Sequence, residues 1–265
     1  MLKWKLLIKT LPLVVCVVAV ALVRDYVVRV PGVIEFSEVS PLLAAVALIV
    51  GFMLAGVLAD YKESEKIPGE IATTLETIGD TVRTVITLNQ QSDVSKFEEK
   101  FRALVATVDD WFVRRVGVEQ CYSKLEEFRA VVETMHSAAG VNYAIRGLAE
   151  MHNLRRLITR VDVISRTSFI PIGYALLELL VATTLGLLLI SNYKTPLAEY
   201  FLLSLFSLIY IYLLRLIRDI DAPFAYSKST NVAGSAEIDP YPLREYRKRL
   251  EGVQRTKLDS TDARV

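Results

Sequence analysis

The sequence predicts an all-α integral membrane protein in which four membrane-spanning helices, arranged in two pairs, flank a helical domain. The chain of 265 residues is 52% hydrophobic, with a mean hydropathy of +0.37. Soluble domains are usually about 45–50% apolar even with glycine included. The apolar residues gather near the N-terminus and in residues 167–217. Between these regions, apolar residues recur at the spacing of an amphipathic helix.

The first pair of spans is predicted in residues 11–59, after a short N-terminal segment of residues 1–10. Three lysines precede an apolar run over residues 11–23, which continues with interruptions to Ile34. A basic start before a short apolar core also fits a signal peptide, but a second apolar run follows it instead of a soluble domain. That second run, residues 41–59, has no charge in 19 residues. This is about the length that crosses a hydrocarbon core of about 30 Å.

The second pair of spans is predicted in residues 167–217. The third apolar run, residues 167–193, contains a single charged side chain, and the fourth covers residues 200–214. The fourth run is short for a span, but Arg215 and Arg218 follow it directly. Arginine side chains at such positions can extend to the membrane surface, so the run is still expected to cross.

The single charge of the third run, Glu178, is a candidate functional residue. An ionisable side chain at membrane depth is costly and suggests function by default. We expect Glu178 near the outer-to-middle part of its span. Two structural alternatives are a protonated glutamate bonded to a neighbouring helix and a carboxylate close enough to an interface to reach water. Tyr174, Thr183 and Thr184 are the candidate partners by sequence proximity.

The distribution of cations predicts the orientation, because cytoplasmic segments carry an excess of Lys and Arg. The N-terminal segment has three lysines and no acid, and two arginines follow the fourth span. The segment that enters the third span contains Arg146, Arg155, Arg156, Arg160 and Arg166. The loops within each pair of spans have no such excess. We therefore expect a multi-pass cell-membrane protein with both termini and the middle domain in the cytoplasm.

The middle domain, residues 60–166, is predicted to be helical throughout. It contains four apolar stripes with a period near 3.6 residues, with breaks at Pro68-Gly69, near residues 91–93, at Gly117 and around Gly140. The stripes are Ile71, Leu75, Ile78, Val82 and Val85; Phe97, Phe101, Leu104, Val108, Trp111 and Phe112; Val118, Cys121, Leu125, Phe128, Val132 and Met135; and Ile145, Leu148, Met151, Leu154, Leu157, Val161 and Ile164. The stripes fit either an ordinary bundle core or the wall of a vestibule.

The remaining residues, 218–265, form a predicted cytoplasmic tail. It contains a charged helix candidate at residues 241–258 and carries both signs of charge, so it is interpreted as an arm and not as a polybasic lipid anchor.

Charge, cysteine use and missing motifs disfavour several classes of function. The net charge is +1 and no basic stripe with interleaved aromatic residues is present, so no nucleic-acid partner is expected. Cys16 and Cys121 lie far apart and suggest neither a disulfide framework nor a metal site. His136 and His152 are sixteen residues apart on separate predicted helices. Without a phosphate-binding loop or a nucleophile elbow, we expect no cofactor, no metal and no enzyme activity.

Three motifs in order along the chain resemble the bestrophins, and most closely the bestrophin-like branch of bacterial and plant membrane proteins. They are Gly51-Phe52, the stretch from Ala59 to Glu70 that ends in Pro-Gly-Glu, and the Asp-Ala-Pro-Phe sequence at residues 221–224. The resemblance covers residues 1 to about 226. It implies a homo-oligomeric ion channel, with a pentamer and chloride as the expected assembly and permeant ion.

The resemblance also implies roles for individual residues. Lined up on the shared motif, Phe52 takes the place of the phenylalanine at the bestrophin pore neck, with Leu48 and Ala44 one and two turns before it. From their spacing alone, these three side chains could equally face lipid or a packed neighbour. Asp221, Pro223 and Phe224 match the family motif after the fourth span.

The sequence departs from the family in two places. The paired tryptophans that follow the bestrophin neck are replaced by Tyr61 and Lys62. The acidic cluster that binds calcium in animal bestrophins is missing after Phe224, so calcium gating is not expected. Two alternatives to the channel remain: a non-conducting membrane scaffold or sensor that binds partners through the cytoplasmic helices, and a transporter or enzyme centred on Glu178.

Overall fold

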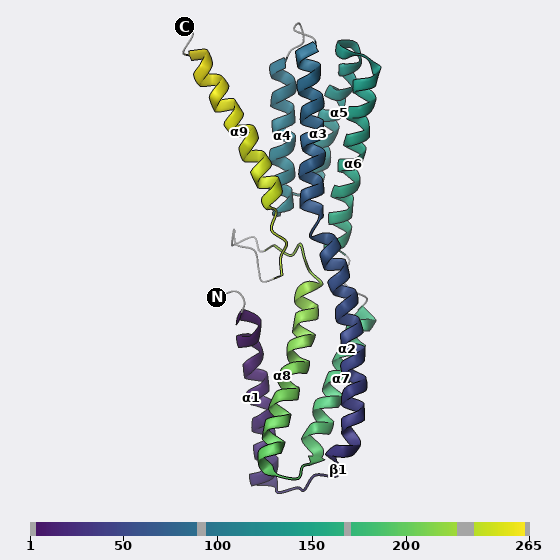
Figure 1. The fold of residues 1–265 in the computed structure, drawn as a ribbon, viewed down its shortest axis with the longest axis vertical. Coiled ribbons are helices and arrows are strands. Elements are labelled where there is room, and N and C mark those ends of the chain that lie inside the picture. Colours follow the sequence, from purple (N-terminus) through teal and green to yellow (C-terminus); the bar gives the residue numbers. More distant parts are fainter. Residues whose placement is uncertain (1–3, 89–93, 167–170, 227–235, 263–265) are drawn as a thin grey trace. The chain divides into compact units, whose positions relative to one another are not determined.

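The computed structural model describes residues 4–88, 94–166, 171–226 and 236–262, and its long elements are all helices. Four of them are long and apolar enough to cross a membrane. The chain is therefore an all-α membrane protein, as the sequence predicts. It divides into two compact units (Figure 1). The first comprises Met1–Lys62, Thr167–Pro223 and Gly234–Glu237, and the second comprises Glu63–Arg166, Phe224–Ala233 and Ile238–Val265.

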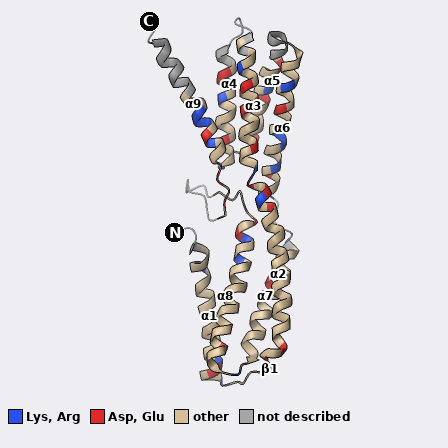
Figure 2. Ribbon diagram, viewed as in Figure 1, with Lys and Arg blue, Asp and Glu red and all other residues tan. Residues whose placement is uncertain are grey.

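The first unit contains the four apolar helices. They are α1 (Lys5–Val23), α2 (Phe36–Ser64), α7 (Pro171–Ile190) and α8 (Pro196–Ile220). A π-helical turn, η2 (Arg24–Val28), extends α1, and two short strands, β1 (Ile34–Glu35) and β2 (Ser191–Asn192), pair in parallel near the loop ends. Charged residues are scarce along these helices and gather at their ends (Figure 2). The 21 uncharged residues between Glu38 and Asp60 of α2 correspond to about 31 Å of helix, enough to cross a bilayer core.

One face of α2 packs into the core of the first unit. Its buried residues are Val39, Leu43, Val46, Val50 and Val57, and they form one cluster with Leu177, Val181, Leu188, Leu203, Tyr210 and Ile217 of α7 and α8. The Tyr210 hydroxyl donates a hydrogen bond of 2.6 Å to the carbonyl oxygen of Leu43. A buried hydroxyl without a partner would cost about 1–3 kcal/mol, so this bond fixes α8 against α2.

A polar network holds the loop end of the first unit. The Arg24 guanidinium donates to the Leu189 carbonyl oxygen, to Glu199 and, over 2.7 Å, to Asp25. The Tyr200 hydroxyl donates to the same Asp25 carboxylate over 2.9 Å. These charges are largely shielded and satisfy one another, as ionic groups removed from water must. In the sequence, Arg24 and Asp25 are noticeable only as part of a loop in which positive and negative charges are balanced.

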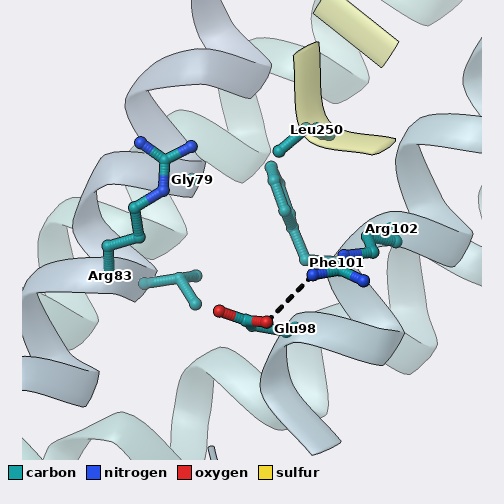
Figure 3. A pocket seen from close by; sticks show the side chains of 7 residues that line it. Gly79, Arg83, Glu98, Phe101, Arg102 and Leu250 are labelled. Atoms are coloured by element: carbon teal, nitrogen blue, oxygen red, sulfur yellow. Dashed lines mark hydrogen bonds and ion pairs between the residues drawn. The ribbon is translucent and has the colours of Figure 1, made fainter. Parts of the chain in front are cut away.

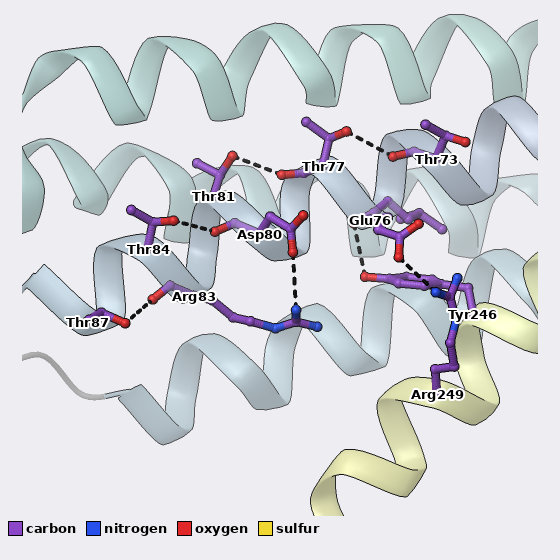
Figure 4. Close-up of polar contacts among 11 residues, drawn as sticks. Thr73, Glu76, Thr77, Asp80, Thr81, Arg83, Thr84, Thr87, Tyr246 and Arg249 are labelled. Atoms are coloured by element: carbon purple, nitrogen blue, oxygen red, sulfur yellow. Dashed lines mark hydrogen bonds and ion pairs between the residues drawn. The ribbon is translucent and has the colours of Figure 1, made fainter.

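The second unit is a bundle of helices. They are α3 (Ile67–Leu88), α4 (Val94–Phe112), α5 (Val118–Ala139), α6 (Val141–Arg166) and α9 (Tyr241–Asp262). The predicted breaks at Gly117 and Gly140 are confirmed, and Gly140 takes the left-handed backbone conformation, φ +97°, that favours glycine. The break predicted at Pro68-Gly69 is misplaced, because α3 already begins at Ile67, and the break near residues 91–93 lies outside the described residues. On the polar side of α3, the Thr77, Thr81, Thr84 and Thr87 hydroxyls each donate to the carbonyl oxygen four residues earlier (Figure 4).

The predicted apolar stripes form the core of this bundle. Every residue of the first two stripes is buried, and so are the first five residues of the third. The side chain of Met135, the sixth, lies outside the described residues. The fourth stripe is wrong at its first residue, because Ile145 is 59% exposed. Its central residues, Met151, Leu154, Leu157 and Val161, are buried.

The tail helix of the predicted mixed-charge arm is docked on the bundle, because α9 packs against α3 and α4. Leu243 and Tyr246 are buried, and the Tyr246 hydroxyl donates to the Leu75 carbonyl oxygen over 3.2 Å (Figure 4). The Arg247 guanidinium lies 2.9 Å from the buried carboxylate of Asp109. Because α9 contributes only a few apolar side chains among many charges, its composition alone gives no sign of docking.

Candidate functional site

The face of α2 opposite the core is apolar and uncovered within the chain. Phe52 is 68% exposed, Leu48 is 60% exposed and Ala44 is also exposed. These are the three residues placed at the neck by the family resemblance, and the structure brings them onto one exposed helix face. Large exposed apolar side chains along a membrane-spanning helix need either lipid or another protein surface to cover them.

The same face is otherwise made of small residues. We call it the α2 outer face, and it consists of Ala44, Leu48, Gly51, Phe52, Ala55 and Ala59. A Cβ added at Gly51 would meet no atom within 4 Å. Small residues let neighbouring helices approach closely. Leu48 and Phe52, four residues or about 6 Å apart along the axis, are therefore the two side chains that protrude from this face.

The ion-pair partner of Glu178 is a residue that sequence proximity did not suggest. Its carboxylate forms an ion pair with Arg218 of α8, and both side chains are about half exposed, at 49% and 51%. The Arg218 guanidinium also lies over the Tyr174 ring, 5.8 Å from its centroid. Glu178 thus lies at the level where the uncharged stretch of α8 ends. An arginine forty residues later in the chain is therefore its ion-pair partner, and its depth in the outer-to-middle part of the span stays a prediction.

The motif after the fourth span has a structural role on each side of Pro223. Asp221 caps the end of α8 and accepts a hydrogen bond of 2.7 Å from the Tyr174 hydroxyl. In the second unit, the Phe224 ring packs edge-on against Phe112, with 5.6 Å between centroids. The Phe224 carbonyl oxygen accepts a bond of 3.0 Å from Arg114 Nε. Arg114 adopts φ 59°, a conformation costing about 1–2 kcal/mol for a residue with a Cβ, so this contact stabilises an otherwise strained turn.

A cavity of about 250 Å³ lies within the second unit, between α3, α4 and α9 (Figure 3). Phe101 and Leu250 line it, together with the stems of Arg83 and Arg102. Arg102 is already paired with Glu98 over 3.0 Å. A cavity of this size suits only a small ligand, and none of its charged groups points to a particular chemistry.

Among the residues that the structure describes, no group of three or more His, Cys, Asp or Glu side chains could hold a metal ion. His152 is exposed on α6, and the side chain of His136 lies outside the described part of the chain.

A scan against protein-family models and a search of curated proteins find no match. Solved structures do match. A bacterial bestrophin homologue from Klebsiella pneumoniae superposes with a TM-score of 0.70 at 12% identity, over 92% of this chain and 97% of that one. The fold is that of the bestrophins.

Two further structures agree with this result. A point mutant of the Klebsiella pneumoniae bestrophin homologue gives a TM-score of 0.69 at 11% identity, over 93% of this chain and 99% of that one. A structure described as a membrane protein gives 0.69 at 13% identity, over 92% and 97%. The bestrophin-like fold indicated by the three sequence motifs is therefore confirmed, although the identity is far too low for residue roles to follow from it.

Two features of the bestrophin-like first unit were missed by sequence reasoning. One is the buried network around Arg24, and the other is the pairing of Glu178 with Arg218. Both join helices that are far apart in the sequence. The usable signal was that the third run contains one acid and that two bases follow the uncharged stretch of the fourth, since opposite charges at membrane depth tend to pair.

Proposed function

We propose that this chain is the subunit of an ion channel in which α2 lines the pore of a homo-oligomer, with a pentamer as the expected assembly. The observation that carries the proposal is the α2 outer face. It is apolar and uncovered within one chain, and the two large side chains that rise from it, Leu48 and Phe52, are one turn apart. Copies of such a face arranged around an axis form a tube with one constriction, at Leu48 and Phe52.

The chemistry of this constriction supports a hydrophobic gate. Ala44, Leu48 and Phe52 offer no hydrogen-bonding group from their side chains, so a narrow ring of them would expel water and block hydrated ions. A small widening would let water return and ions pass. Because the ring carries no charge, it sets conductance and not the sign of the permeant ion. We propose an anion, with chloride as the first candidate, by analogy with the bestrophin fold.

The proposed channel has a defined orientation in the membrane and no catalytic role. Both termini and the helical bundle of the second unit are placed in the cytoplasm, following the cations of the N-terminal segment and those after α8. The chain crosses the cell membrane four times. It acts without a cofactor or a metal and has no enzyme activity in this view.

The first experiment is the oligomeric mass of the detergent-purified protein, by light scattering corrected for detergent. About five copies of the 29.7 kDa chain would support a ring of α2 helices around a pore. A monomer or a dimer would leave no ring and would favour the non-conducting scaffold, in which the α2 outer face contacts lipid or another protein.

The second experiment measures chloride flux through vesicles containing the purified protein. Phe52→Ser should raise the flux at least tenfold, because a hydroxyl keeps the constriction wet. Leu179→Ser is the matched control, since Leu179 is 64% exposed on α7 and lies away from the proposed neck. An unchanged flux in Phe52→Ser, or an equal rise in Leu179→Ser, would contradict the assignment of α2 to the pore. A dilution potential across the same vesicles measures the preference for anions over cations.

A further inference from the structure

A second, shallow cavity that is largely open at the surface lies in the first unit, between the start of α1 and the end of α8. It has a volume of about 460 Å³ and is lined by Leu6, Lys9, Arg215, Arg218 and Asp219. It belongs to neither the α2 outer face nor the core. The Arg215 guanidinium donates a hydrogen bond to the Lys9 carbonyl oxygen and so joins the two helices at the edge of this cavity.

Three cationic side chains, Lys9, Arg215 and Arg218, line this cavity. The ion pair with Glu178 neutralises Arg218. The negative charge of Asp219 offsets that of one further cation in the lining. Lys9 is exposed, and within the described part of the chain its ammonium group has no hydrogen bond or ion pair. Arg215 is half-buried, and the one side-chain bond that it forms within the described residues goes to a neutral carbonyl oxygen. Since a guanidinium has five N–H donors, Arg215 and Lys9 together present unsatisfied donors and positive charge at one place.

The opposite ends of the same two helices are different. There Arg24 is paired with Asp25 and Glu199, and all three side chains are largely buried against one another. The charges at that end are satisfied by the protein itself. The positive charge at the Lys9 end is balanced only in part, so this end attracts an external anion.

The depth of this cavity selects the kind of anion. Lys9 and Arg24 enclose 14 uncharged residues of α1, and Glu199 and Arg215 enclose 15 of α8, or about 21 and 23 Å of helix. Both stretches are shorter than the hydrocarbon core of about 30 Å. Lys9 and Arg215 therefore begin near the acyl chains and extend outward, which brings their charged groups to the level of the lipid phosphates.

We propose that this cavity binds the phosphate of an anionic phospholipid, held by Lys9 and Arg215, with an acyl chain along the apolar side chains that begin at Leu6. The exposed Trp4 at the start of α1 suits the same interfacial level. Basic pockets between membrane helices are a known type of lipid headgroup site. The site does not depend on ion conduction, so it stands or falls separately from the channel.

The test uses Trp4 as a local probe. The full chain is placed in phosphatidylcholine vesicles that contain either brominated phosphatidylglycerol or brominated phosphatidylcholine, and quenching of tryptophan fluorescence is measured. The chain has two tryptophans, and Trp111 is buried in the second unit, where it gives the same background with both lipids. We expect phosphatidylglycerol to quench Trp4 at a lower mole fraction than phosphatidylcholine does.

Substitutions separate the proposed site from a general surface effect. Lys9→Gln and Arg215→Gln should each reduce the preference for phosphatidylglycerol about fivefold, the effect of one basic residue near an anionic surface. Lys9→Arg should retain it. Lys194→Gln is the matched control, because Lys194 is exposed in the loop at the opposite end of the unit, and it should leave the preference unchanged.

Three results would overturn the proposal. The first is equal quenching by the two lipids in the unmodified protein. The second is a loss of preference in Lys194→Gln as large as that in Lys9→Gln. The third is loss of the preference on adding inorganic phosphate but not on adding chloride at the same ionic strength, because this would make the cavity a site for free anions. Gel filtration of every variant excludes misfolding as the cause of a lost preference.

Discussion

The two units bury apolar side chains in different ways. In the second unit, apolar residues face inward and charged ones outward, as in a soluble bundle, so the periodicity of the sequence locates the core directly. In the first unit, both faces of each span are apolar, and Val50 on the core side of α2 looks the same in the sequence as Leu48 on the outer face. Lipid is as apolar as a protein core, so hydropathy does not distinguish the two surfaces.

Polar residues carry the missing information in the first unit. The Glu178–Arg218 pair joins α7 and α8 near one end, and the Arg24 network joins them at the other end. In the second unit, polar contacts add to a core that apolar stripes already define. The exception is α9, which depends on a buried ion pair for part of its docking.

The largest predicted effect is a difference in thiol reactivity, which measures how completely the core of the second unit excludes water. Burial raises the pKa of the Cys121 thiol to about 12, so at about pH 8 only about one thiol in ten thousand is ionised. In a Cys16→Ser background, Cys121 should react with a maleimide about a thousandfold more slowly than a cysteine introduced by Ser123→Cys, at an exposed position of the same helix.

The pH dependence of this reaction gives a second check. The rate at Cys121 should keep rising with pH beyond about pH 9, whereas the rate for Ser123→Cys should level off near the ordinary thiol pKa of about 8.5. Equal rates and equal profiles at the two positions would show that α5 does not face a closed core. Mass spectrometry of the labelled protein measures both.

The next effect concerns the docking of α9. Asp109 is 7% exposed in its side chain, and its Oδ1 atom has no hydrogen-bond partner in the described structure. Arg247→Met would remove its cation and leave a buried carboxylate uncompensated, which costs about 3 kcal/mol. Amide hydrogen exchange in α9 should then be about a hundredfold faster.

Arg249→Met is the matched control for this prediction. Arg249 pairs with Glu76 over 3.0 Å on the surface of the same helix, where both side chains are largely exposed. Such a pair contributes about 0–1 kcal/mol, so exchange in α9 should change only a few-fold. Similar exchange rates in the two variants would mean that apolar contacts alone hold α9.

The sequence predicts the parts of this molecule that depend on local pattern. The four spans follow from length and hydropathy, and the breaks at Gly117 and Gly140 follow from turn chemistry. Ile145 was misplaced because the buried face of α6 begins with the small residues Ala144 and Gly147, and Ile145 lies to one side of that face. Periodicity describes a face of a helix, and only the tertiary structure decides which face is covered.

The candidate site was predicted only in part, for the same reason. The spacing of Ala44, Leu48 and Phe52 places them on one helix face, and the family resemblance implies that this face lines the pore neck. The sequence alone does not indicate that this face is uncovered within the chain. The pairing of Glu178 with Arg218 was missed because the candidate partners were sought nearby in the chain. Arg218 becomes a neighbour only when α7 and α8 pack side by side.

The smallest predicted effect is the coupling energy of the Glu178–Arg218 pair in the first unit, which is compared with that of the buried Asp109–Arg247 pair in the second. Glu178 and Arg218 are each about half exposed in the chain, so their coupling should be about 0.5–1 kcal/mol. The coupling is measured by thermal melting of the purified protein in a double-mutant cycle of Glu178→Gln, Arg218→Gln and both together. A coupling above about 2 kcal/mol would place the pair in a low-dielectric environment at membrane depth. The Glu178 carboxylate would then be buried like that of Asp109, and the level assigned to it at the end of the span would be wrong.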